Sequence, residues 1–74
     1  MTEAIVDARG LKCPLPVLKA KKALQALPAG AALRVLATDP LSNQDIPDLC
    51  RLTGDVLLEA KEDGGTFSFL IRRM

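Results

Sequence analysis

The spacing of the apolar residues changes from one segment of this chain to the next, and that change constrains the fold more than any other feature. Segments 14–27 and 42–53 repeat apolar residues at intervals of three and four, the pattern of a helix with one buried face. Four shorter segments are apolar or alternate between apolar and polar residues, as β-strands do: 4–7, 33–37, 55–61 and 66–74. The sequence therefore predicts the element order β-α-β-α-β-β.

Both helical segments carry one apolar stripe and end at a recognisable signal. Pro28-Ala29-Gly30 ends the first helix, and Gly54 ends the second. Pro47 is expected within the first turn of the second helix, where its missing N–H is tolerated. The stripes consist of Val17, Ala20, Leu24 and Leu27 in the first helix, and of Ile46, Leu49, Cys50 and Thr53 in the second.

The strands are expected to form one mixed sheet. Residues 33–37 suit a central strand that is covered on one face, and residues 62–65 have the composition of a hairpin loop. The side chains expected to point inward are Val56, Leu58 and Ala60, and then Phe67, Phe69 and Ile71. The predicted fold class is α/β (α+β), a single domain over residues 1–74 in which two helices cover one face of a four-stranded mixed sheet.

The composition excludes several kinds of chemistry. Ten Lys and Arg nearly balance nine Asp and Glu, for a net charge of +1, so no strong attraction to nucleic acid or membranes follows. With no His and two Cys, the chain alone cannot perform Cys–His catalysis or complete a structural zinc site, and we expect neither a metal nor a cofactor. Residues 1–6 lack the features of a secretory signal, so free thiols in a cytoplasmic protein are expected.

Segment 10–16, Gly-Leu-Lys-Cys-Pro-Leu-Pro, is the part of the sequence that indicates chemistry. Cys13 is expected at the N-cap of the first helix, with Pro14 as the first helical residue and Pro16 still in the first turn. The two prolines stiffen this turn, and Gly10 is available for a positive φ in the preceding loop. The segment therefore predicts a thiol held on a rigid corner of the surface.

The expected surroundings of Cys13 favour its thiolate form. The Leu15 amide is predicted to be among the donors nearest the sulfur, beside the positive end of the helix dipole, and Lys12 and Arg9 add positive charge. These effects predict a Cys13 pKa below the free value of about 8.5, and hence a nucleophile that can receive an atom and pass it on. Cys50 lies on the apolar stripe of the second helix and is expected to be a packed core thiol.

Two leucines of the first helix fall outside its apolar stripe. On a helical projection, Leu15 and Leu18 lie on the side shared with Lys22 and close to Lys19. Exposed leucines beside a reactive sulfur and bordered by lysines suit a transient protein interface. These four residues are therefore the predicted partner-binding surface.

Several short motifs resemble the TusA/SirA family of small sulfur-carrier proteins, and the likeness covers nearly the whole chain. The resemblance implies the same β-α-β-α-β-β sandwich. It also implies that Cys13 accepts persulfide sulfur from a cysteine desulfurase or a rhodanese-like donor and passes it to a downstream acceptor, as a sulfurtransferase-type carrier rather than a self-sufficient enzyme. The motifs are Asp7, Gly10-Leu11-Lys12-Cys13-Pro14-Leu15-Pro16, Asp39-Pro40, Asp45-Ile46-Pro47 with Cys50, and Leu70-Ile71-Arg72-Arg73.

One position departs from the better-studied members of that family. Members that serve thiolation of the tRNA wobble uridine carry Glu between the two prolines, where this chain has Leu15. The acceptor pathway, whether tRNA thiolation, molybdenum-cofactor synthesis or sulfur oxidation, therefore stays open. Two other functions are alternatives: an RNA-binding module, which the near-neutral charge and scarce aromatic residues disfavour, and a regulatory interaction protein in which Cys13 is vestigial.

Overall fold

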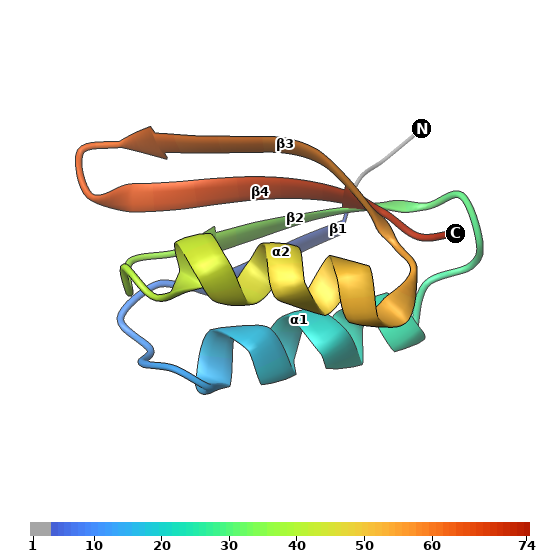
Figure 1. Ribbon diagram of the computed structural model, residues 1–74, viewed down its shortest axis with the longest axis horizontal. Helices are drawn as coiled ribbons and strands as arrows, with labels where there is room; N and C mark the ends of the chain where they lie inside the picture. The colour runs from blue at the N-terminus through green and yellow to red at the C-terminus, as the bar shows by residue number, and fades with distance from the viewer. Residues whose placement is uncertain (1–3) are drawn as a thin grey trace.

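The computed structural model describes residues 4–74 and contains six elements in the predicted order (Figure 1). Residues 1–3, part of the segment 1–6 that lacks the features of a secretory signal, lie outside the described residues. Neither helix between residues 4 and 74 is long and apolar enough to cross a membrane. The elements are β1 (Ala4–Ala8), α1 (Leu15–Gln25), β2 (Ala32–Ala37), α2 (Ser42–Thr53), β3 (Val56–Asp63) and β4 (Thr66–Arg72).

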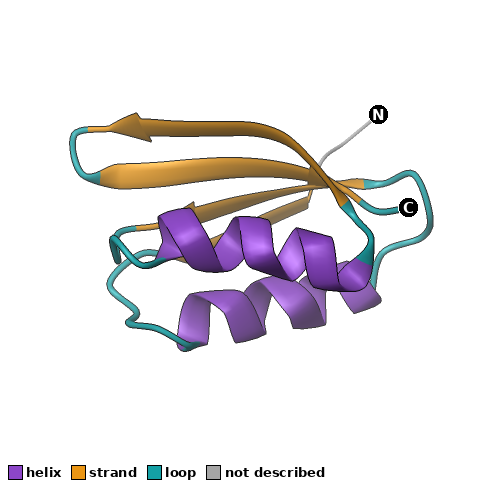
Figure 2. Cartoon of the chain, viewed as in Figure 1, coloured by secondary structure: helices purple, strands orange, loops and turns teal. Residues whose placement is uncertain are grey.

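The four strands form one mixed sheet in the order β1-β2-β4-β3. β1 and β2 are parallel, whereas β4 is antiparallel to both β2 and β3. Both helices pack side by side on one face of this sheet, which makes the fold a two-layer sandwich (Figures 1 and 2). The predicted fold class and the central position of the strand over residues 33–37 are both confirmed.

The core lies between the helices and the sheet, and the apolar stripes predicted from the sequence supply most of it. Thr53 is an exception: it is exposed, and its hydroxyl lies within hydrogen-bond distance of both the Leu49 carbonyl and the Asp55 carboxylate. Pro16, in the first turn of α1, is fully buried. The buried core residues of the helices and the central strands are Ala20, Leu24, Leu33, Val35, Ile46, Leu49, Cys50, Phe67, Phe69 and Ile71.

The side chains of strand β3 that face the core are not the ones that simple alternation predicts. Leu57 pairs with Ile71 and packs against the core, but the next pair joins Glu59 to Leu70, so Leu58 is an extra residue that forms a β-bulge. The bulge shifts the alternation by one residue. The prediction of inward side chains is therefore wrong for Val56 and Leu58, which are exposed on the other face. Ala60 is also exposed, but it pairs with Phe69 and lies on the predicted face.

Helix α2 has the predicted bounds, but its proline is not in the predicted place. The helix begins at Ser42, so Pro47 lies in its interior rather than in its first turn. A proline there deprives the carbonyl four residues earlier, that of Asn43, of its helical partner. Asn43 is exposed, so water can solvate that carbonyl. The helix ends as predicted at Gly54, whose φ of 80° suits glycine.

The parallel pair places the starts of both helices at one end of the molecule. The last pair of the β1–β2 ladder is Ala8 with Ala37, so the loops that lead into α1 and α2 leave the sheet side by side. The carboxyl end of the chain lies at the opposite end (Figure 1). There the Arg73 side chain donates hydrogen bonds to the carbonyls of Leu24 and Leu27, where α1 ends.

Candidate functional site

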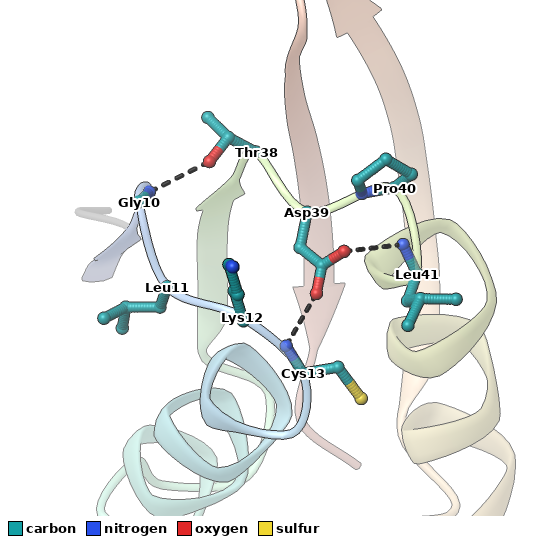
Figure 3. A pocket seen from close by; sticks show the side chains of 8 residues that line it. All are labelled: Gly10, Leu11, Lys12, Cys13, Thr38, Asp39, Pro40 and Leu41. Atoms are coloured by element: carbon teal, nitrogen blue, oxygen red, sulfur yellow. Dashed lines mark hydrogen bonds between the residues drawn. The ribbon is translucent and has the colours of Figure 1, made fainter.

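Two loops meet beside the start of α1 and hold Cys13 between them and α2 (Figure 3). The Gly10 amide donates a hydrogen bond of 2.9 Å to the Thr38 hydroxyl. The Cys13 amide donates one of 2.6 Å to Asp39 Oδ2, while Asp39 Oδ1 accepts from the Leu41 amide at 3.2 Å. One carboxylate thus ties the Cys13 loop to the loop that begins α2, and the two loops line a shallow pocket of about 470 Å³.

Gly10 allows the first loop to turn sharply after β1. Its φ of +81° is the positive value that the sequence predicted for this position, and the next amide, that of Leu11, donates back to the Ala8 carbonyl at 3.2 Å. Asp7 also belongs to this corner, because its carboxylate accepts hydrogen bonds from the Arg9 amide and guanidinium. Asp7 and Asp39 therefore both stabilise the turns at this corner through nearby backbone amides.

Cys13 is exposed but does not occupy the predicted helix position. The N-cap of α1 is Pro14, so Cys13 lies one residue before it, and the Cys13–Pro14 peptide bond is cis. The Leu15 amide, expected near the sulfur, donates to the Lys12 carbonyl at 2.9 Å instead. Because Pro14 and Pro16 have no N–H, the helix start offers the sulfur fewer donors than an ordinary first turn would.

The Cys13 sulfur points toward α2 and hydrogen-bonds to an acidic side chain there. Its thiol donates to Asp45 Oδ2 at 2.8 Å. This hydrogen bond, partial removal from water, and the negative charges of Asp45 and Asp39 all raise the pKa of Cys13 above its usual value. The prediction of a lowered Cys13 pKa is therefore wrong for the isolated chain.

The two cations expected to lower that pKa lie in other surroundings. Arg9 forms an ion pair of 2.8 Å with Asp7, which it holds at a pKa of about 2. Lys12 extends on the other side of the loop from the Cys13 sulfur (Figure 3). Neither side chain offsets the carboxylates that face the thiol.

Asp45 is the site residue that reasoning from the chemistry of the sequence missed. An acidic residue in the first turn of a helix usually needs no further explanation than the helix dipole. The available signal was topological: two parallel strands followed by helices bring both helix starts to one edge of the sheet. Polar side chains in the first turn of α2 are then candidates to contact the loop before α1.

The remaining predicted residues lie where the sequence placed them. Leu15 and Leu18 are 48% and 53% exposed on the outer side of α1, and Lys19 and Lys22 are also exposed. Cys50 is 4% exposed in the core, and its pKa is raised by burial and then by Asp55. Residues 4–74 contain no group of three or more acidic, Cys or His side chains that could hold a metal ion.

The fold and site define a class of protein: a small two-layer α+β domain that presents one exposed thiol where two βα loops meet. Residues 4–73 match the family described as sulfurtransferase TusA. The chain is 52% identical over 68 residues to the sulfur carrier protein TusA of Allochromatium vinosum, covering 92% of this chain and 90% of that protein. It is 46% identical over 71 residues to the protein of the same name from Pseudomonas putida, covering 96% and 89%.

A solved structure supports the same relationship. The crystal structure of a SirA-like protein from Desulfitobacterium hafniense superposes with a TM-score of 0.82 at 32% identity, over 93% of this chain and 95% of that one. The chain therefore belongs to the TusA family.

Proposed function

We propose that this protein is a sulfur carrier and that Cys13 holds the sulfur as a persulfide. The observation that carries the proposal is the contrast between the two thiols: Cys13 is exposed at the junction of two loops, whereas Cys50 is buried in the core. A partner's cysteine can approach only the first without unfolding the chain. The names of the TusA relatives support the same role.

The transfer that such a site supports is an exchange between a thiol and a persulfide. The Cys13 sulfur, after losing its proton to solvent, attacks the terminal sulfur of a donor persulfide. A new S–S bond forms at Cys13, the donor's S–S bond breaks, and the departing donor thiolate takes up a proton. Cys13–SH and donor–S–SH become Cys13–S–SH and donor–SH, with no net oxidation.

The donor proposed from the family resemblance is a cysteine desulfurase or a rhodanese-like protein. Transfer to an acceptor is the same reaction, with the Cys13 persulfide as the sulfur donor. The acceptor class, among tRNA thiolation, molybdenum-cofactor synthesis and sulfur oxidation, is left open by Leu15 between the two prolines. A shallow and open site suits a carrier, because it must admit a different protein at each end of the relay.

Peptide mass mapping tests the proposal directly. The wild-type protein is incubated with a cysteine desulfurase and free cysteine, the thiols are blocked without reduction, and each cysteine peptide is weighed. We expect added sulfur on the Cys13 peptide and none on the Cys50 peptide. Sulfur on Cys50, or no sulfur on either peptide when a known carrier is loaded in parallel, would contradict the proposal.

The proposed partner surface can be tested with charged substitutions on α1. Leu15→Glu and Leu18→Glu are expected to slow sulfur loading by about tenfold, because each places a charge where a partner would bury an apolar side chain. The fold should change little, because both leucines are already half exposed, and the alkylation rate of Cys13 reports any effect of the added charge on the thiol itself. Loading rates with the donor and alkylation rates without it separate docking from thiol reactivity.

Leu58→Glu is the matched control for these two variants. Leu58 is 50% exposed, close to the values for Leu15 and Leu18, but it lies in the β3 bulge rather than on α1. It should load sulfur at the wild-type rate. Equal slowing in all three variants would indicate a general effect of added negative charge, and wild-type rates in Leu15→Glu and Leu18→Glu would place docking elsewhere.

A further inference from the structure

We propose that Asp45 is a positioning residue of the carrier: its carboxylate holds the proton of the empty Cys13 thiol and keeps the sulfur turned toward α2. The inference rests on the proposed function and adds a residue to it. Asp45 would control which form of the nucleophile a partner meets. The carrier would then wait for its donor as a thiol rather than as a thiolate.

The geometry of the contact carries this inference. The Cys13 sulfur and Asp45 Oδ2 are 2.8 Å apart, and only a protonated thiol can donate across that distance to a carboxylate. A hydrogen bond to a charged acceptor is stronger than one between neutral groups. The position of Cys13, which donates this hydrogen bond, is also fixed through its backbone, because Asp39 of the neighbouring loop accepts a hydrogen bond from the Cys13 amide.

The charges that face the sulfur are mainly negative. Asp45 comes from α2, and Asp39 comes from the loop between β2 and α2. Asp48 lines the same groove one turn after Asp45, but its carboxylate is ion-paired with Arg51. Of the cations nearby in the sequence, Arg9 is paired with Asp7, and Lys12 extends on the other side of the loop. The field at the sulfur therefore opposes ionisation, in agreement with the raised Cys13 pKa.

Loading would end this control by removing the proton on which it depends. In a persulfide, the Cys13 sulfur is bonded to Cβ and to the terminal sulfur, so it has no proton to donate. The hydrogen bond to Asp45 can then not persist, and a deprotonated terminal sulfur is repelled by the same carboxylate. The empty and the loaded carrier would thus present the sulfur differently to their partners.

The test compares the pH dependence of Cys13 alkylation in three proteins: wild type, Asp45→Asn and Asp48→Asn. Iodoacetamide modification of the Cys13 peptide is followed from pH 6 to about 10, which spans the free thiol value. The wild-type midpoint should lie above about 8.5. Asp45→Asn should lower it and raise the rate at pH 7 at least about threefold, because the thiolate fraction grows tenfold for each unit by which the pKa falls.

Asp48→Asn is the matched control, because Asp48 lines the same groove but pairs with Arg51 and makes no hydrogen bond to the sulfur. Its midpoint should move less than that of Asp45→Asn. A wild-type midpoint at or below the free value overturns the proposal even if both variants fail to fold. An unchanged midpoint in folded Asp45→Asn, or an equal shift in Asp48→Asn, overturns it as well. Alkylation needs no sulfur donor, so this result is independent of whether Cys13 loads sulfur.

Discussion

Replacing Cys13 with serine is expected to abolish sulfur loading. The hydroxyl is nearly isosteric with the thiol and can still donate a hydrogen bond to Asp45, but it cannot form an S–S bond. The fold should be preserved, because residue 13 is exposed and makes its anchoring bond to Asp39 through the backbone amide. Intact-protein mass after incubation with a desulfurase and cysteine should show no added sulfur, and urea unfolding should match wild type within about 0.5 kcal/mol.

Cys50→Ala is the control for this experiment. It leaves Cys13 as the single thiol of the chain and removes a buried sulfur without introducing a polar group. Loading in the folded fraction should match that of the wild type. Loading that survives in Cys13→Ser, or that disappears in folded Cys50→Ala, would show that our proposal assigns the sulfur to the wrong cysteine.

Phe69→Ala is expected to produce the largest loss of stability of any single truncation in the core. Phe69 is 1% exposed on β4, where it pairs with Val35 on one side and Ala60 on the other, and it belongs to the core cluster that also contains buried residues of both helices. Removing a buried aromatic ring costs about 3–5 kcal/mol, the lost transfer energy plus the cavity. That loss is comparable to the whole stability of many small domains, which is about 5 kcal/mol at the lower end.

Urea unfolding followed by circular dichroism measures this effect. Ile5→Ala serves as the comparison, because Ile5 is a large apolar residue of the sheet that is 63% exposed, and its truncation should cost less than about 1 kcal/mol. A Phe69→Ala protein that unfolds at the same urea concentration as Ile5→Ala would show that the core is not centred on the face of β4 that carries Phe69.

The sequence predicted the elements well, because the signals for them are local. Intervals of three and four between apolar residues identified both helices, Gly54 identified the end of α2, and the apolar run over 33–37 identified the central strand. The exposure of Cys13 and the burial of Cys50 followed from the same local reasoning. Each of these features depends on residues that lie close together in the sequence.

The errors arose where distant segments decide the outcome. The β3 bulge at Leu58 depends on how that strand pairs with β4, so simple alternation predicted the wrong face. The hydrogen bond from Cys13 to Asp45 joins residues 32 positions apart. Local charge favoured the thiolate through Lys12 and Arg9, whereas the folded chain surrounds the sulfur with carboxylates from the second βα loop and α2.

The position of the chain's carboxyl end has a practical consequence for experiments on this protein. Met74 follows the strand end that Arg73 ties to the last turn of α1, and Cys13 precedes the first turn of the same helix (Figure 1). The 11 residues of α1 separate the two points by about 16 Å along the helix. A resin or a fusion partner attached after Met74 would therefore lie at the far end of α1 from Cys13 and leave its sulfur accessible. A matrix made in this way is suited to capturing desulfurases and acceptors through sulfur exchange.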